Sequence, residues 1–259
     1  MPRLLHPLAL LALLLLAGCQ RGLVIDDSLR ARDQNSRVDF IVIHYTSADL
    51  QRSLQLLTSG GVSAHYLLPA DQPKVYRLVE EERRAWHAGD SYWRGRSWLN
   101  ASSIGIELVN TSGEGADGQM QWQPWPQEQI DRLILLLRDL KARHGIEPRN
   151  IVGHSDIAPQ RKIDPGPLFP WPQLAAAGLI PWPDAARVAQ LRPQFEAQLP
   201  PLLWFQQQLA RIGYAAPQDG LPSEATRNVL AAFQMKYRPA RFDGVADVET
   251  AALLAALPD

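Results

Sequence analysis

Residues 153–167 read GHSDIAPQRKIDPGP and form the most informative stretch of the chain. His154 and Asp164 carry side chains that ligate divalent metals, and Lys162 precedes Asp164 by two positions. Residues two apart in extended chain point to the same side, so this cation and this carboxylate can face one pocket. The short apolar run before His154 predicts a strand and therefore a metal site at a strand end. The alternative is solvated loop chain with no ligand.

A second histidine follows a second apolar run. Residues 39–46 read DFIVIHYT, a buried-strand pattern of β-branched and aromatic residues with His44 near its end. A catalytic zinc site takes three protein ligands and keeps a fourth position open for water. His44, His154 and Asp164 supply such a set, although either histidine taken alone is more often a surface or core residue.

A third strand is predicted at residues 103–110, which read SIGIELVN and place Glu107 within an apolar run. Burying a charge is costly unless the group is paired or functional. Near a metal-bound water, a glutamate is the usual general base for amide hydrolysis. The alternative for Glu107 is a structural salt bridge with Arg83 or Arg84.

Five segments in order carry a family resemblance: FIVIHYT at 40–46, VSAHYLL at 62–68, RAWHAG at 84–89, SIGIE at 103–107 and HSDIAPQRKIDPG at 154–166. Together they resemble the zinc N-acetylmuramoyl-L-alanine amidases of the AmpD/AmiD type. Animal peptidoglycan-recognition proteins and a phage lysozyme amidase share the fold of that family. The resemblance covers residues 37–183 and implies an α/β catalytic domain with a mixed central sheet flanked by helices.

The resemblance also implies roles for individual residues. It implies one zinc ion per chain, Zn2+, with three ligands: His44, His154 and Asp164. It implies two catalytic groups, Glu107 as the base and Lys162 as the second group. It further implies three residues along the substrate groove: Trp86, His87 and Arg96. Some relatives carry a cysteine as the third ligand, where this chain has an aspartate.

Two other histidines are expected to have no direct role. His65 lies in a strand-like segment at a position that the family does not use for a ligand, so we expect it to support the site or the fold. His144 precedes Gly145 at the end of a predicted helix, where a partial positive charge suits the helix dipole.

The N-terminus predicts export. Arg3 and His6 precede an apolar run at 8–17 that is too short to span a bilayer comfortably. These features predict a lipoprotein signal peptide over residues 1–18, followed by a polar tether over residues 19–36.

The end of this leader resembles a bacterial lipobox, because residues 16–19 read LAGC. Cys19 is the single cysteine of the chain and the predicted lipidation site. Gln20 stands where an aspartate would retain the protein at the inner membrane. We therefore expect an outer membrane lipoprotein facing the periplasm of a Gram-negative bacterium. The alternative is a plain secretory leader with an incidental cysteine.

Composition excludes two other classes of function. The chain has 259 residues and a net charge of −1, which gives no electrostatic case for nucleic acid. Wall enzymes such as L,D-transpeptidases need a cysteine nucleophile. The single cysteine of this chain lies in the leader, which disfavours that class of enzyme.

Helices alternate with the predicted strands. Ser47 is expected to cap a short helix that runs through Leu57, and Pro126 to open a longer one. The apolar face of the longer helix consists of Ile130, Leu133, Ile134, Leu137 and Leu140. The glycine-rich loop 110–126 is expected to border the site.

The C-terminal part contains an internal repeat. Residues 219–226 read DGLPSEAT and residues 243–250 read DGVADVET, each followed by an apolar helix. We expect a linker over residues 184–199 and a three-helix domain over residues 200–259, which resembles the peptidoglycan-binding domain of wall enzymes. The alternative is a helical domain that stabilises the chain and binds nothing.

The function predicted from this resemblance is zinc-dependent hydrolysis of the amide bond between the lactyl group of N-acetylmuramic acid and L-alanine. The expected partners are peptidoglycan and muropeptides, together with the membrane through the lipid anchor. The rival is a peptidoglycan-binding lipoprotein without catalysis, which the complete set of ligand and catalytic positions disfavours.

Overall fold

The computed structural model describes Leu23 and residues 25–258. The chain divides into two compact units, residues 1–34 and residues 35–259. In the first unit the described residues form bends, one of them held by the carboxylate of Asp26, which accepts a hydrogen bond from Ser28 N (2.9 Å). No helix within the described residues is long and apolar enough to cross a membrane. The predicted signal peptide and Cys19 lie outside the described residues.

A mixed sheet forms the centre of the second unit, with strand order β3-β2-β6-β1-β9. Its strands are β1 (Phe40–Tyr45), β2 (Tyr66–Leu68), β3 (Tyr76–Arg77), β6 (Ser103–Leu108) and β9 (Ile151–Gly153). The β1 strand pairs in parallel with β6 and β9, β2 pairs in parallel with β6, and only the edge strand β3 is antiparallel. The α/β class and the mixed sheet expected from the sequence are confirmed.

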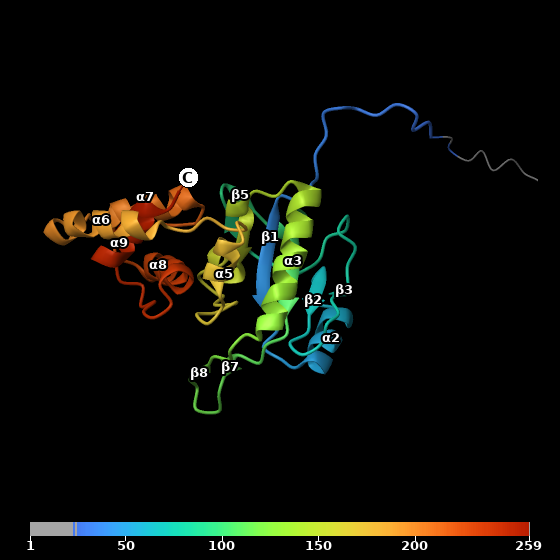
Figure 1. Ribbon diagram of the computed structural model, residues 1–259, viewed down its shortest axis with the longest axis horizontal. Coiled ribbons are helices and arrows are strands. Elements are labelled where there is room, and N and C mark those ends of the chain that lie inside the picture. The colour runs from blue at the N-terminus through green and yellow to red at the C-terminus, as the bar shows by residue number, and fades with distance from the viewer. Residues whose placement is uncertain (1–22, 24, 259) are drawn as a thin grey trace, which may run out of the picture. The chain divides into compact units, whose positions relative to one another are not determined.

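Helices and two short hairpins surround this sheet (Figure 1). The helices are α2 (Leu50–Thr58), α3 (Gln127–His144), α4 (His154–Ile157), α5 (Trp171–Ala176), α6 (Ala185–Ala197), α7 (Leu202–Ile212), α8 (Glu224–Tyr237) and α9 (Val248–Ala256). The hairpins pair β4 (Tyr92–Trp93) with β5 (Arg96–Ser97), and β7 (Gly113–Glu114) with β8 (Met120–Gln121). Figure 1 shows the β7–β8 hairpin beyond the carboxyl end of β1.

The residues of β1 alternate between two apolar clusters, as the period of a strand requires. Ile41 and Ile43 belong to the cluster that contains the apolar face of α3. Phe40 and Val42 belong to a second cluster, which runs through Trp93 to buried residues of α7, α8 and α9. The C-terminal helices therefore share one continuous core with the second face of the sheet.

The two predicted helices of the catalytic part are present, with one correction. The α2 helix is capped by Asp49, whose carboxylate accepts from Arg52 N at 2.8 Å, and not by Ser47. The Ser47 hydroxyl donates instead to Ser112 O (2.8 Å), and its backbone adopts a positive φ of 50°. A residue tied to the neighbouring loop in this way is not available as a helix cap.

The α3 helix begins after Pro126 as predicted and ends at the left-handed Gly145. His144 contributes a tertiary contact in addition to its place at the helix end, because its Nε2 lies 2.6 Å from a carboxylate oxygen of Glu81. Arg143 donates to both oxygens of the same carboxylate, at 2.6 and 2.8 Å. The hydrogen bonds from Arg143 outweigh the effect of burial and lower the pKa of Glu81 to about 2.

The segment expected to be a linker, residues 184–199, is mostly helix α6. Asp184 caps this helix by accepting from Arg187 N (2.7 Å), and the helix packs along α9. Leu191 and Phe195 are buried in the same core as the later helices. Irregular chain was expected here, but the buried apolar side chains stabilise a helix that contains Pro193.

The internal repeat of the C-terminal part is a structural repeat, and each copy is held by a buried glutamine that the sequence analysis did not single out. Gln206 on α7 is fully buried. Its amide donates to Asp219 Oδ1 and to Thr226 Oγ1, both at 3.0 Å, and its carbonyl oxygen accepts from Gly220 N at 2.7 Å. One side chain thus joins the Asp-Gly turn to the first turn of α8.

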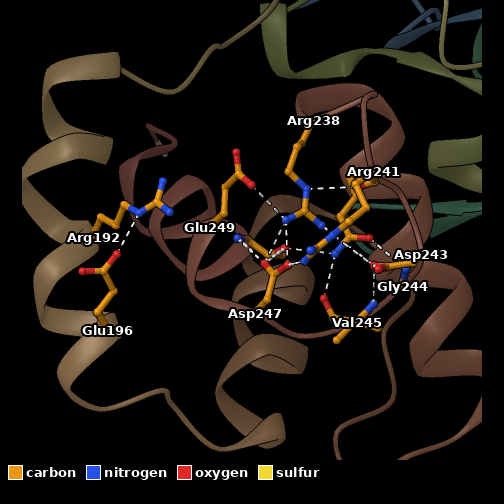
Figure 2. Close-up of polar contacts among 11 residues, drawn as sticks. Arg192, Glu196, Arg238, Arg241, Asp243, Gly244, Val245, Asp247 and Glu249 are labelled. Carbon is orange, nitrogen blue, oxygen red and sulfur yellow. Dashed lines mark hydrogen bonds and ion pairs between the residues drawn. The ribbon is translucent and has the colours of Figure 1, made fainter.

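Gln234 on α8 repeats this arrangement around the second turn. It donates to Val245 O (2.8 Å) and Thr250 Oγ1 (2.9 Å), and it accepts from Gly244 N (2.8 Å). Ion pairs surround this second turn, where Arg238 donates to Asp247 at 2.7 Å (Figure 2). The glutamines precede their Asp-Gly turns by different numbers of residues, which obscures them in the aligned repeat.

We predict that Gln206→Ala lowers the free energy of unfolding by about 2–4 kcal/mol, because it leaves buried polar partners unsatisfied and opens a cavity. Chemical denaturation of the purified protein measures this. Its neighbour Gln207 is exposed on the same helix and provides the matched control. Gln207→Ala should change the free energy of unfolding by less than about 0.5 kcal/mol. Equal losses in both variants would contradict the role assigned to Gln206.

Candidate metal centre and active-site pocket

The parallel register of the sheet brings three predicted site residues to one edge. His44 is paired in register with Glu107 on the neighbouring strand β6. On the other side, Ile43 of β1 pairs with Gly153 of β9. The residues that follow these two are His44 and His154, which therefore lie next to each other. In open sheets with parallel strands, the carboxyl ends of the strands form the usual place for a ligand.

Asp164 completes a group of three potential metal ligands with these two histidines, and their ligand atoms all lie within 4.8 Å of one another. The Nδ1 atoms of His44 and His154 are 2.9 Å apart. The Asp164 Oδ2 atom lies 3.2 Å from the first of these and 3.1 Å from the second. All three residues are buried. The ligand set predicted from the sequence is therefore assembled in space.

This set fits a zinc ion in size and in chemistry. With zinc–nitrogen bonds of about 2.1 Å, ligand atoms of a tetrahedral site lie about 3.4 Å apart. The three distances observed here, 2.9, 3.1 and 3.2 Å, are somewhat shorter, so small shifts of the side chains would admit the ion. Two imidazoles and one carboxylate are also ligand types that zinc accepts in catalytic sites, with the fourth position open to the pocket.

The protonation state of the ligands suits metal binding. Burial, followed by repulsion from His154, lowers the pKa of His44 to about 4, so this imidazole is neutral at pH 7. Burial alone would raise the pKa of Asp164. The proximity of His154 and then of His44, whose Nδ1 atoms lie 3.1 and 3.2 Å from its Oδ2, outweighs burial and holds the pKa of Asp164 well below its usual range. A neutral imidazole and an ionised carboxylate are the forms that ligate.

A chain of hydrogen bonds behind His44 fixes the orientation of its ring. The Nε2 atom of His44 lies 3.0 Å from Nδ1 of His87. With Nδ1 as the ligand atom, Nε2 carries the proton and donates to His87. His87 in turn donates through Nε2 to Ser103 Oγ (3.1 Å), which donates to Leu99 O (2.6 Å). Partners of this kind hold the tautomer and the angle of a metal-ligating histidine.

His87 borders the pocket, in agreement with the place on the substrate groove expected for it. Its ring nitrogens also contact His44 and Ser103, which gives it a second role that the sequence did not indicate. Gly105 makes room for this ring, since a Cβ at that position would lie 2.4 Å from a ring atom of His87. The glycine of the SIGIE segment is thus explained by the support behind a metal ligand.

Glu107 faces the same pocket with a free carboxylate oxygen. Its Oε2 is buried and has no hydrogen-bond partner among the residues that the structure describes. Burial, and then the charge of Asp164, raise the pKa of Glu107 to about 8, while Lys162 opposes the shift. The alternative of a salt bridge is not observed, and Arg84 stacks instead on Trp86, 5.5 Å from its ring centre. A buried carboxylate with a perturbed pKa beside a metal site is a candidate acid–base group.

Lys162 and a second cation lie on the rim of the pocket. Lys162 lines it and is close enough to affect the pKa values of His44 and Glu107. Arg161 also lines the pocket and donates to Asp90 O (2.6 Å) and to Ala88 O. No role for Arg161 was predicted from the sequence, although this residue directly precedes Lys162 in the stretch 153–167.

The pocket has a volume of about 480 Å³ and opens to solvent above the three ligands. Trp86 borders it and is 56% exposed, which leaves its ring available to a sugar or peptide as predicted. Gly113, Glu114 and Met120 of the β7–β8 hairpin border the other side. The loop 110–126 thus contributes to the rim.

Arg96 is not brought to this pocket. It lies in the β4–β5 hairpin and forms an ion pair with Asp39 at 3.5 Å. The sequence order of the motifs suggested a place in the groove, but the short hairpin directs this residue toward the amino end of β1. His65 is fully buried, accepts from Gly105 N (3.0 Å) and contacts Arg83 O, which agrees with the structural role expected for it.

The fold and the site define an α/β protein with a His-His-Asp group that could hold a metal ion at the bottom of an open pocket. Residues 34–167 match the family described as N-acetylmuramoyl-L-alanine amidase, and residues 198–254 match the family described as "Putative peptidoglycan binding domain". The chain belongs to the N-acetylmuramoyl-L-alanine amidase family.

Known proteins of this family match the chain over nearly its whole length. It is 45% identical to N-acetylmuramoyl-L-alanine amidase AmiD of Escherichia coli, over 95% of this chain and 94% of that protein. The crystal structure of AmpDh3 from Pseudomonas aeruginosa in complex with anhydromuramic pentapeptide is 42% identical, with a TM-score of 0.84 over 91% of this chain and 97% of that one.

A second solved structure is the E. coli AmiD complex with the substrate anhydro-N-acetylmuramic acid-L-Ala-D-γ-Glu-L-Lys. It matches with a TM-score of 0.81 and 43% identity, over 91% of this chain and 94% of that one. The relative AmpD of Enterobacter cloacae is 42% identical over 41% of this chain and 54% of its own length. The amidase family and its fold are therefore established for this chain.

We predict that metal-free protein binds one equivalent of Zn2+ and that Asp164→Ala weakens this binding by more than about 100-fold. Loss of a partner behind a ligand typically costs about 10–100-fold, and loss of the ligand itself should cost more. Competition with a chromophoric chelator measures the affinity. Asp71→Ala, at an exposed aspartate, is the control and should bind zinc like the wild type. Unchanged affinity in Asp164→Ala would remove this residue from the ligand set.

Proposed function

We propose that this chain is a zinc-dependent amidase that hydrolyses the bond between the lactyl group of N-acetylmuramic acid and L-alanine. One observation carries the proposal. Three potential ligand atoms converge at the bottom of the pocket, beside a buried carboxylate oxygen of Glu107 for which the described part of the chain offers no hydrogen-bond partner. Family membership supplies the reaction class, because the matching relatives are named as amidases of this bond type.

The roles of the chain's own residues follow from their places in the pocket. When bound, zinc supplies a Lewis acid that polarises the amide carbonyl and lowers the pKa of water. Glu107 takes a proton from the attacking water and returns it to the departing amine of L-alanine. A carboxyl group with a pKa near the working pH can perform both transfers.

Lys162 supplies a fixed positive charge on the rim, where the carbonyl oxygen becomes negative in the tetrahedral intermediate. A preorganised cation at such a place stabilises the transition state more than the ground state. His87 holds the ring of His44 in place, and the exposed face of Trp86 offers a contact for the sugar or the peptide.

The substrate class that we propose is the muropeptide with an anhydromuramic end. The solved relatives AmpDh3 and AmiD hold anhydromuramic peptides, and both match this chain over 91% of its length. Intact peptidoglycan is the second substrate to be tested, because residues 198–254 match a peptidoglycan-binding family. Mass spectrometry of products released from soluble anhydromuropeptides and from purified sacculi tests both. No release of the peptide from either substrate would end the proposal.

We predict that Glu107→Ala lowers kcat by about 10²–10⁴-fold and retains zinc, because Glu107 is proposed as an acid–base group and not as a ligand. Steady-state kinetics on a soluble muropeptide, with metal analysis of the same preparation, measure both effects. Glu128→Gln, at an exposed carboxylate of α3, should leave both unchanged. If Glu107→Ala lost its zinc, the residue would be a ligand and the proposed role would be wrong.

We predict that Lys162→Ala lowers kcat by about 10²–10³-fold, the loss typical of one oxyanion donor, and also retains zinc. The physical reason is that its charge acts on an oxyanion that exists only during the reaction. Lys74→Ala is the matched control at an exposed lysine outside the pocket. A change confined to KM would show that Lys162 serves substrate binding alone.

We also propose that the mature protein is anchored by a lipid on Cys19 and faces the periplasm from the outer membrane. The support for this is the leader sequence that ends in LAGC at residues 16–19, followed by Gln20. One acyl chain holds a protein to a membrane only marginally, whereas two or more hold it stably.

We predict that replacing residues 1–19 with an ordinary cleavable leader moves the protein to the soluble periplasm, because the lipid is its anchor. Cell fractionation measures the shift, and specific activity on muropeptides should be unchanged. The unaltered chain, fractionated in parallel, is the control. Continued sedimentation of the altered protein with outer membranes after digestion of the peptidoglycan would contradict the anchor.

A further inference from the structure

The C-terminal helices contact the segment that lies between two of the metal ligands. His154 begins α4, and Asp164 follows ten residues later. Within this interval, Asp156 and Gln160 both contact residues of the C-terminal helices, at distances typical of hydrogen bonds. The contacts attach the metal-binding segment to the helices at two separate points.

The first point is the carboxylate of Asp156, which accepts three strong hydrogen bonds. Its Oδ2 accepts from Gly153 N at 2.8 Å and from the Lys236 ammonium at 2.7 Å. Its Oδ1 accepts from the Tyr214 hydroxyl at 2.6 Å. Asp156, Lys236 and Tyr214 are 1%, 6% and 2% exposed, so the whole cluster is removed from solvent.

The Lys236 ammonium is well placed to fix the carboxylate, since it also lies over the ring of Trp171, 4.2 Å from the ring centre. A buried charge must be paired, and the loss of one partner leaves the other uncompensated. With Lys236 and Tyr214 in place, both oxygens of Asp156 are held, and Asp156 in turn fixes the backbone N–H of Gly153. That residue immediately precedes the ligand His154.

The second point of attachment is Gln160, which lies midway along the segment. Its amide donates to Ala225 O at 3.0 Å, and its carbonyl oxygen accepts from the amide of Asn228 at 3.0 Å. Both partners are on α8, the helix that also carries Lys236. One helix therefore holds the beginning and the middle of the segment.

The segment needs such support for a physical reason. The α4 helix spans only His154–Ile157, and a single helical turn has little stability of its own. A metal ligand also has to be held close to its productive geometry, and the groups behind the ligands do this. For His44 that support comes from His87, inside the sheet domain. For His154, the Nε2 atom lies 3.3 Å from Ala88 O, also in the sheet domain. The backbone before it, at Gly153, is held by Asp156, whose partners Lys236 and Tyr214 come from the C-terminal part.

We propose that Lys236 and Tyr214 are positioning residues for the metal ligand His154, acting through Asp156. The C-terminal helices are then a part of the catalytic unit and support turnover of a small soluble muropeptide, apart from any contact with the wall. This inference rests on the proposed zinc amidase function.

The test uses three full-length variants. Lys236→Met removes the charge and keeps most of the side-chain volume. Tyr214→Phe removes one hydroxyl and keeps the ring that packs against Trp93, 4.9 Å between centres, so it should fold even if Lys236→Met does not. Arg238→Met is the matched control, because Arg238 is also a buried cation that directly follows α8, but its partners are Asp247 and Glu249.

Three quantities are measured well below the unfolding temperature of each variant. These are the Zn2+ affinity of metal-free protein by chelator competition, the visible absorption spectrum of the Co2+-substituted protein, and kcat and KM on a soluble anhydromuropeptide. We expect Lys236→Met to weaken zinc binding and lower kcat by roughly 10-fold each, the lower end of the effect of a partner behind a ligand. Tyr214→Phe should change both in the same direction by less, and both variants should alter the Co2+ spectrum. KM should change little.

Arg238→Met should lower Tm and leave the zinc affinity, the Co2+ spectrum and kcat at wild-type values. Two outcomes overturn the inference. One is wild-type zinc affinity, spectrum and kcat in Tyr214→Phe and in any folded Lys236→Met. The other is an equal loss of zinc affinity in Arg238→Met, which would mark the effect as general destabilisation. If the wild type itself failed to bind zinc or to release peptide, the proposed function would be wrong. If the wild type did both and the variants did not differ from it, only the present inference would be wrong.

Discussion

The site depends on one constraint, the parallel register of β1 with its two neighbours. On one side of β1, His44 pairs with Glu107. On the other side, Ile43 pairs with Gly153, which brings His154 next to His44. The register thus places an acid–base candidate beside two candidate ligands. A shift by one residue would turn every side chain of a strand to the opposite face. The apolar alternation of β1 prevents that shift, because Ile41 and Ile43 are buried on the α3 side of the sheet.

The same register brings together polar groups whose burial would otherwise only lower the stability of the fold. Two imidazoles with their Nδ1 atoms 2.9 Å apart, and a buried carboxylate with a free oxygen, are not what packing alone would select. Their pKa values move in the direction that burial dictates, to about 4 for His44 and about 8 for Glu107. Folded proteins tolerate such arrangements at functional sites when the surrounding structure is stable enough to hold them.

The grouping of His44, His154 and Asp164 could be predicted from the sequence because the motifs that contain them are local and rigid. Strand ends at His44 and His154 can be read from the apolar runs before them, and the fold class follows from the alternation of strands and helices. The residues behind the ligands could not be predicted in the same way. His87 reaches His44 from 43 positions away, and only the space left by Gly105 shows why. The capping role given to Ser47 was wrong, because a tertiary contact to Ser112 took priority over local propensity.

The C-terminal part shows most clearly what a sequence pattern leaves out. The Asp-Gly repeat predicted a separate helical domain, and the proline-rich stretch before it predicted a linker. Neither pattern reveals that Phe40 and Val42 on the second face of β1 belong to the same core as α7, α8 and α9. A central sheet needs both faces covered, and α3 covers only one. The helices that match a peptidoglycan-binding family therefore complete the layers of the catalytic fold. This shared core brings Lys236 of α8, and Tyr214 just after α7, to the carboxylate of Asp156 close to His154.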